Sequence, residues 1–158
     1  MKKRSLYGLW AVCWLLAACG ALLIAAGPIA GLRLKELTLS KPGIMWLSSI
    51  YLWGFAAIYL CALIRFVRVV KNIALDRSFI TENARAMRAI STLAFLAGAW
   101  IAAGAALIPL TDLPVPAPYC VCGAILAVGC VVVGLLARAL SKLTARAAEI
   151  KAENDLTV

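Results

Sequence analysis

The sequence has no histidine, and its seven acidic residues are outnumbered by sixteen lysines and arginines. Histidine is the commonest general base and the commonest metal ligand, so its absence removes the residue on which many enzyme sites depend. The sequence also lacks a glycine-rich phosphate-binding loop, a cluster of metal-ligating residues and a paired nucleophile and base. We therefore expect a protein that is not an enzyme and that uses neither a metal nor a cofactor.

A Cys-x-x-Cys pair is also missing, although the chain has six cysteines. Each lies within or at the end of an apolar run, where cysteine behaves as a small packing residue. They are Cys13, Cys19, Cys61, Cys120, Cys122 and Cys130. Two residues apart on a helix, Cys120 and Cys122 would point in different directions, so we expect no disulfide between them. A disulfide between one of these two cysteines and a partner protein is an alternative that the sequence leaves open.

Charge is absent from four long stretches of the chain, which is 65% apolar and has a mean hydropathy of +0.97. A soluble domain is only about half apolar. A helix needs about 20 apolar residues to cross a bilayer, and each stretch is close to that length. The sequence therefore predicts an all-α integral membrane protein, a single four-helix bundle. Its spans cover residues 6–27, 44–64, 89–110 and 119–137.

The lack of charged residues inside the four spans also limits the function. Proton relays and ion pathways through membranes usually need such groups. Hydroxyl side chains in these spans, such as that of Thr92, are expected to bond to their own helix backbone. A pump, an ion-coupled transporter and an intramembrane protease are therefore disfavoured.

The first apolar run has a second interpretation. Leu16-Ala17-Ala18-Cys19 is similar to the cleavage box of a bacterial lipoprotein signal, after a basic start and an apolar run. Against this interpretation, the apolar run continues past the cysteine to Ala26. We favour a membrane span, with lipidation of Cys19 as the alternative that mass spectrometry would establish.

Basic residues are concentrated on one side of the four predicted spans. Thirteen of the sixteen lie in the N-terminal segment, in residues 65–88 or after residue 137, and three lie in the two other links. Basic flanks of membrane spans stay in the cytoplasm. We therefore expect both termini and the central segment to face the cytoplasm, beside anionic lipid headgroups. Direct binding of nucleic acid is not expected.

Residues 65–88 are expected to form a helical hairpin that extends the second and third spans into the cytoplasm. Apolar and polar positions recur with helical spacing from Arg65 to Leu75. The turn falls near residues 76–79. Thr81 is the expected N-cap of the second helix, and Glu82 then stands in the first turn, where the helix dipole favours negative charge.

Residues 138–158 are expected to form a cytoplasmic helix and tail. In and just before this segment, a row of residues recurs at spacings of four and three, which is typical of a coiled-coil seam. The row consists of Leu136, Leu140, Leu143, Ala147, Ile150 and Asn154. Two alternatives stay open: the helix packs back on the hairpin, or it pairs with a second copy in a homodimer.

Small residues recur at helical spacing in the fourth span, and such a stripe lets helices approach closely in lipid. This predicted helix-packing stripe consists of Gly123, Ala127, Cys130 and Gly134. A similar surface in the third span consists of Gly98, Ala102 and Ala105. The alternative explanation is the general abundance of small residues in the chain.

Two polar segments, Ser78–Arg88 and Glu153–Val158, carry a family resemblance. They read Ser-Phe-Ile-Thr-Glu-Asn-Ala-Arg-Ala-Met-Arg and Glu-Asn-Asp-Leu-Thr-Val. With the four spans, they resemble the bacterial membrane-protein family named domain of unknown function 2975. That family typically has a Phe-Thr-x-Glu-Asn-type segment in the middle loop and a Glu-Asn-Asp/Glu-Leu-Thr-Ile/Val ending. Here Ile80 is interposed, and Arg77-Ser78 stands where a glycine often precedes the phenylalanine.

The resemblance implies a bacterial inner-membrane protein with no established activity. Members are often encoded beside a small Cro-type helix-turn-helix repressor, so the leading hypothesis is a membrane protein that binds or restrains such a cytoplasmic regulator. The expected docking residues are Phe79, Thr81, Glu82, Asn83, Arg85, Arg88, Glu153, Asn154, Asp155, Leu156, Thr157 and Val158. The alternatives are a small envelope immunity or stress-tolerance protein that acts through its spans, and a transporter accessory subunit.

Overall fold

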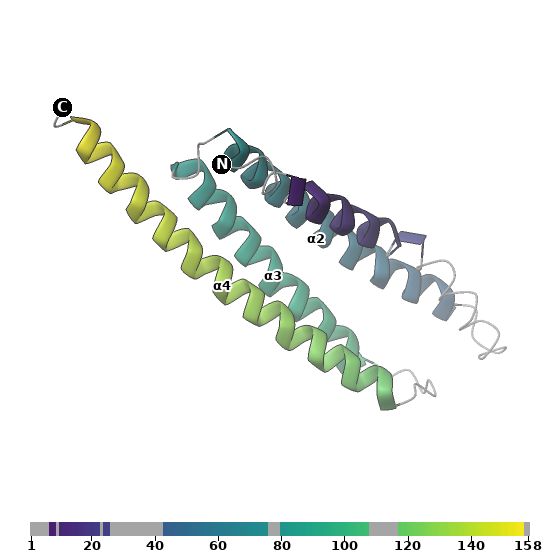
Figure 1. Ribbon diagram of the computed structural model, residues 1–158. Helices are drawn as coiled ribbons and strands as arrows, with labels where there is room; N and C mark the ends of the chain where they lie inside the picture. The colour runs from purple at the N-terminus through teal and green to yellow at the C-terminus, as the bar shows by residue number, and fades with distance from the viewer. Residues whose placement is uncertain are drawn as a thin grey trace.

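The computed structural model describes residues 7–8, 10–22, 24–25, 43–75, 80–107 and 117–156, and all of these except Leu75 and Ile80 are helical (Figure 1). Three long helices dominate these residues: α2 (Gly43–Ala74), α3 (Thr81–Leu107) and α4 (Ala117–Leu156). A shorter apolar helix, Trp10–Leu22, precedes them and is called the N-terminal helix. The predicted all-α class is confirmed.

Three of the helices are long and apolar enough to cross a membrane, over Ser49–Ala74, Thr81–Leu107 and Cys120–Asn154. Many of their large apolar side chains are exposed; Trp46 and Val128, for example, are each 63% exposed. Such a surface suits lipid, where the helix satisfies its own backbone groups and apolar side chains face acyl chains. The prediction of apolar spanning helices is thereby supported for three of the four spans, and the first span stays a prediction.

The helices continue past the ends of the predicted spans. α2 runs without interruption through Arg65 to Ala74, and α4 runs through Arg138 to Leu156. With 40 residues, α4 is about 60 Å long at 1.5 Å per residue, roughly twice the thickness of a bilayer core. The polar parts of both helices are therefore continuous with their apolar parts, as expected for α2. The predicted turn at residues 76–79 lies outside the described residues.

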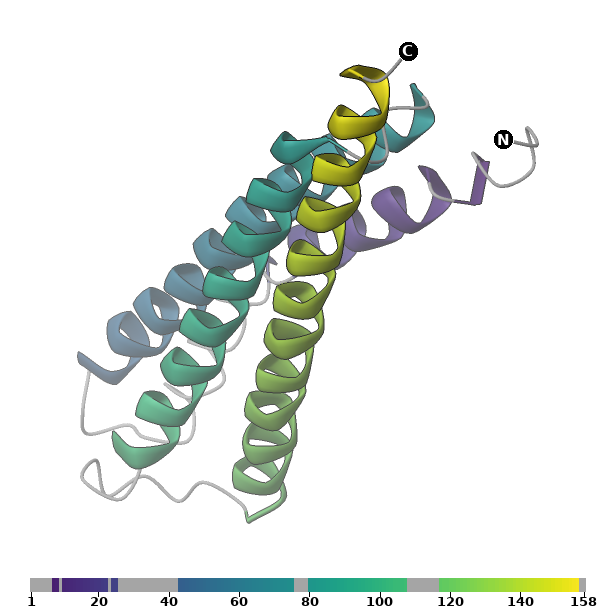
Figure 2. The same ribbon diagram turned by 90° about the vertical axis from the view of Figure 1, so that its left-hand side faces the viewer.

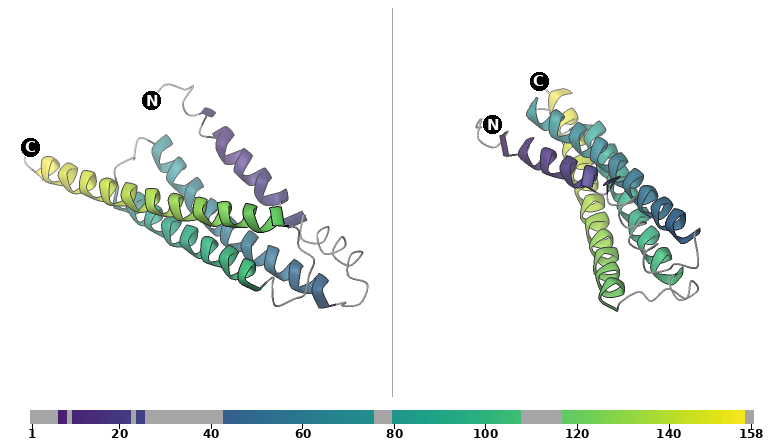
Figure 3. Two further views of the ribbon diagram at one scale, coloured as in Figure 1. Left: turned by 90° about the horizontal axis from the view of Figure 1, so that it is seen from below. Right: turned by 90° about the vertical axis from the view of Figure 1, so that its right-hand side faces the viewer.

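α3 lies between its two long neighbours (Figure 1, Figure 2). It packs antiparallel on α4 and, less extensively, on α2, whereas α2 and α4 make no contact with each other within their described residues. The N-terminal helix packs on α2, where the Tyr59 hydroxyl donates a 2.7 Å hydrogen bond to the Leu16 carbonyl. Figure 3 shows this arrangement from two further sides. Among the three long helices, the α3–α4 pair thus makes the more extensive contact.

Candidate functional site

The α3–α4 contact is a seam of small residues that repeats every seven positions. Gly98 faces the Ala127 carbonyl, Ser91 bonds to Gly134, and Ala84 bonds to Ser141. Successive contacts are thus seven residues apart on both helices. Because seven residues complete two turns, each contact falls on the same face of its helix. The small side chains let the two backbones lie close together.

Two serines form hydrogen bonds across this seam, one from α3 to α4 and the other from α4 to α3. Ser91 of α3 donates a 2.7 Å hydrogen bond to the Gly134 carbonyl, and Ser141 of α4 donates one of the same length to the Ala84 carbonyl. Both hydroxyls are buried, with exposed fractions of 2% and 1%. A buried hydroxyl needs a partner to offset the loss of water, and each serine finds one on the neighbouring helix.

The predicted small-residue stripe of α4 lies partly against α3. A Cβ added at Gly98 would lie 3.3 Å from the Ala127 carbonyl oxygen and from the Cys130 Cβ, and one at Gly134 would lie 3.0 Å from the Phe95 ring. A Cβ at Gly123, by contrast, would meet only Ile101, at 4.0 Å. On α3, Gly98 is buried, while Ala102 is exposed and Ala105 is half-buried.

The α2–α3 contact is joined by a reciprocal pair of aromatic residues. The Trp100 indole N–H donates to the Tyr51 carbonyl at 3.0 Å, and the Tyr51 hydroxyl donates to the carbonyls of Trp100 and Ile101 at 3.1 and 3.3 Å. Their rings stack with centroids 5.8 Å apart. Gly54 and Gly104 provide the space, because a Cβ at either would collide with Trp100 or Tyr51. Both polar tips are therefore satisfied inside the apolar part of the molecule.

At the opposite end of the same contact, two asparagines join α2 to α3. The Asn72 side-chain amide donates a 2.7 Å hydrogen bond to Oδ1 of Asn83, and Asn83 is only 2% exposed. Asn83 is one of the expected docking residues. In the structure its side chain belongs to the helix contact and is not part of the exposed surface.

The remaining described docking residues of α3 are exposed. Helix α3 begins at Thr81, and the Ile80 carbonyl accepts the N–H groups of Asn83 and Ala84 at 3.1 and 3.4 Å. Ile80 therefore occupies the N-cap position, one residue before the expected cap. Glu82 stands in the first turn as predicted. The exposed residues are Thr81, Glu82, Arg85 and Arg88.

The second predicted docking segment lies at the end of α4. Glu153 and Asn154 are exposed, and the helix ends at Leu156. Glu153 is twelve residues beyond Ser141, or about 18 Å along the helix, so this end projects past the first turn of α3 (Figure 1). Phe79, Thr157 and Val158 lie outside the described residues, as do the side chains of Asp155 and Leu156.

The leucine-rich row predicted as a coiled-coil seam does not form the α3 contact. Leu136, Leu140, Leu143 and Ile150 are 48–61% exposed. The face toward α3 includes instead Gly134, Ala137 and Ser141, all of them buried. The start of the predicted C-terminal segment does pack on the first turns of α3, because Ser141 bonds to Ala84. Pairing of the leucine row with a second copy stays a prediction.

Few potentially reactive side chains lie close together among the described residues. Among them, no group of three Cys, Asp or Glu side chains is arranged to hold a metal ion. All six cysteines belong to the described residues and are free thiols, so Cys120 and Cys122 do not bridge each other, as expected. Cys13 is buried, Cys130 is half-buried and the other four are exposed. Thr92 donates to the Arg88 carbonyl of its own helix at 3.2 Å, which confirms the expectation for that hydroxyl.

Sequence reasoning missed the two serines of the seam and the Tyr51–Trp100 pair. A signal for the serines was present, because small residues recur every seven positions at 84, 91 and 98 and at 127, 134 and 141. The aromatic pair had no such signal. It depends on the antiparallel register that brings Tyr51 beside Trp100 across 49 residues of sequence.

Comparison with known proteins identifies a family for this chain. No curated protein and no solved structure matches this chain. The model of one protein family matches residues 14–158, which is nearly the whole chain, and that family is described as a protein of unknown function, DUF2975. The match includes all three long helices and both polar segments singled out in the sequence. The chain therefore belongs to the DUF2975 family.

Proposed function

We propose that this protein is a non-enzymatic membrane anchor that docks a cytoplasmic regulatory protein, such as a helix-turn-helix repressor, at the bacterial inner membrane. The observation that carries the proposal is the placement of two exposed polar segments at one end of the molecule. One is the start of α3 and the other is the end of α4. They are distant in sequence and are brought together by the antiparallel packing of the two helices.

The exposed surface of this end offers charges of both signs. Arg85 and Arg88 lie on α3, and Glu153 and Asn154 lie on the projecting end of α4. Exposed charges of this kind set the orientation and the rate of protein association more than its affinity. Asn83 supports the surface from within, because its bond to Asn72 holds the first turn of α3 against α2. A partner would thus meet a rigid helix start beside a projecting helix end.

The test is co-purification of the full-length protein in mild detergent with a helix-turn-helix repressor of the kind that the family resemblance implies. We expect the native protein to retain the repressor, and Arg85→Glu/Arg88→Glu to lose most of it, because charge reversal opposes a complementary surface. The matched control is Arg138→Glu/Lys142→Glu, which reverses two exposed charges on α4 and should retain the repressor. Failure of the native protein to retain it, with and without envelope stress, would overturn the proposal.

A comparison of the cellular phenotypes of variants separates this proposal from a protein that acts through its spans. In that case reversal of Arg85 and Arg88 would leave the cellular phenotype unchanged. A bulky residue at Gly134, which lies against Phe95, would instead abolish it. The docking proposal predicts the opposite order for any folded variant.

A further inference from the structure

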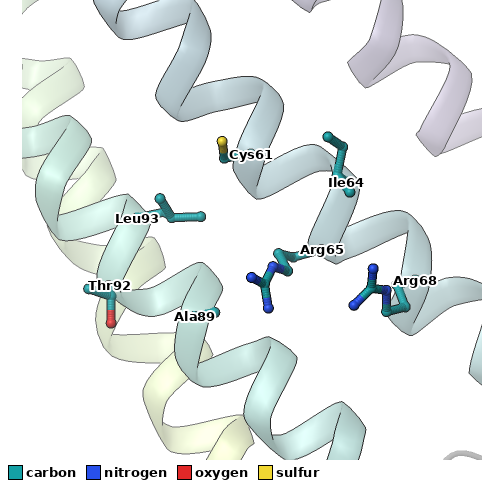
Figure 4. Close-up of a pocket in the computed structure, with 7 residues that line it drawn as sticks. All are labelled: Cys61, Ile64, Arg65, Arg68, Ala89, Thr92 and Leu93. Carbon is teal, nitrogen blue, oxygen red and sulfur yellow. The ribbon is translucent and has the colours of Figure 1, made fainter.

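A groove opens between α2 and α3 and is lined by residues of both helices (Figure 4). Its volume is about 630 Å³. The α2 wall carries Arg65 and Arg68, whose guanidinium groups lie toward the space between the two helices. The remaining lining residues are Cys61, Ile64, Ala89, Thr92 and Leu93. None of these seven residues is acidic, so the groove presents two positive charges beside a mostly apolar wall.

The groove lies where both helices change from charged to uncharged sequence. On α2 the uncharged run ends at Ile64, and Arg65 is the first charge after it. On α3 the last charge before the uncharged run is Arg88, directly before Ala89. The groove therefore straddles the boundary between the apolar and the polar parts of the hairpin. In a membrane this boundary falls at the level of the lipid headgroups.

We propose that this groove binds one anionic phospholipid molecule. The phosphate lies beside Arg65 and Arg68, and an acyl chain follows the apolar wall of Cys61, Ile64 and Leu93. Guanidinium groups suit this headgroup because they form charge-assisted hydrogen bonds with phosphate oxygens. The apolar wall suits the chain because it lies on the membrane side of the two arginines. This lipid site is independent of the proposed docking surface.

General attraction of basic residues to an anionic membrane is the alternative that the experiment must separate. Arg138 on α4 provides the control, because the helix registers place it at the same height as Arg68. Asn72 pairs with Asn83 on one side of α3, and Ser141 pairs with Ala84 on the other. Arg68 and Arg138 therefore both lie level with Met87, but Arg138 is exposed on α4, which makes no contact with α2 among the described residues.

The test measures lipid retained by the full-length protein in detergent by native mass spectrometry, with phosphatidylglycerol and phosphatidylcholine of identical acyl chains. We expect one tightly bound phosphatidylglycerol and little phosphatidylcholine. Arg65→Gln/Arg68→Gln should weaken phosphatidylglycerol binding about thirtyfold, at about 1 kcal/mol for each basic residue. The control Arg138→Gln/Lys142→Gln removes the same charge and should change binding less than twofold, as roughly expected for basic residues outside the groove.

A second variant tests the groove itself. Leu93→Trp fills the apolar wall and leaves both arginines in place, so it should also reduce phosphatidylglycerol binding. Its helical content and elution volume verify that it folds. Equal losses in the two double-glutamine variants, equal binding of the two lipids, or full binding by folded Leu93→Trp would each overturn the lipid site. None of these outcomes bears on retention of the repressor, so the two proposals fail independently.

Discussion

Single glycines decide how closely these helices approach. Gly134 leaves room for the Phe95 ring because it has no side chain, and its carbonyl accepts the hydrogen bond of the Ser91 hydroxyl. Gly129, five residues earlier on the same helix, has no atom of another helix within 4 Å of an added Cβ. The two positions differ only in what surrounds them. Glycine content alone therefore does not mark a packing position.

This difference predicts unequal effects of one substitution at the two glycines. Gly134→Leu should lower the free energy of unfolding in detergent by about 1–3 kcal/mol, because overpacking forces α3 and α4 apart. Gly129→Leu should leave it nearly unchanged. Unfolding in sodium dodecyl sulfate, followed by far-ultraviolet circular dichroism, measures both. Equal effects of the two substitutions would contradict the α3–α4 seam.

At the scale of the helices, α3 is the element on which the others are organised. Its face toward α4 consists of small residues, one of which carries a hydroxyl group. Its contact with α2 has an aromatic pair near one end and an asparagine pair near the other. Hydrogen bonds from side chains to the neighbouring helix fix the register of two apolar helices more specifically than apolar contact does, because a shifted helix would leave buried polar groups unpaired. The polar contacts thus set the alignment of the hairpin.

The asparagine pair is testable by a double-mutant cycle in Asn72→Ala and Asn83→Ala. Asn83 is nearly fully buried, whereas Asn72 is half-buried. We expect Asn83→Ala to cost more, about 1–3 kcal/mol, because the Asn72 amide then loses its acceptor inside the contact. The coupling between the two should be about 0.5–1.5 kcal/mol. Strictly additive effects on the unfolding free energy would show that the hydrogen bond contributes nothing.

At the scale of the whole molecule, the polar parts of the three long helices lie at one end within the described residues, and their apolar parts lie toward the other. α2 and α4 each have a polar part that continues an apolar part, and α3 begins at the polar end. Antiparallel packing places the end of α2, the start of α3 and the end of α4 together. The asymmetry of basic residues predicts that this end faces the cytoplasm.

Cysteine labelling of intact cells tests that orientation. In a background without the native cysteines, Glu153→Cys should react with a membrane-impermeant maleimide only after the cells are opened. A cysteine introduced at Thr111, in the predicted external link, should react in intact cells. Labelling of position 153 from outside would place the docking surface away from every cytoplasmic partner.

Much of the fold was predictable because its signals are local. The uncharged runs predict the three long helices, and Glu82 marks the first turn of α3 as expected. The leucine row of α4 suggested a coiled-coil seam, but α3 packs on a face of small residues, because small side chains let two helix backbones lie close together. Asn83 was expected on the exposed surface because its side chain is polar, but it is buried where Asn72 of α2 bonds to it.

The sequence by itself determined the helical class, the apolar spans and the crowding of basic residues on one side, because length, hydropathy and charge are properties of consecutive residues. Only the tertiary structure decided which faces meet. It paired Ser91 with Gly134 and Asn72 with Asn83, and it placed Arg65 and Arg68 beside a groove. The physical reason is that in an apolar environment nearly every face of a helix is acceptable to lipid. The choice among those faces then rests on close fit and on a few hydrogen bonds between residues far apart in the chain.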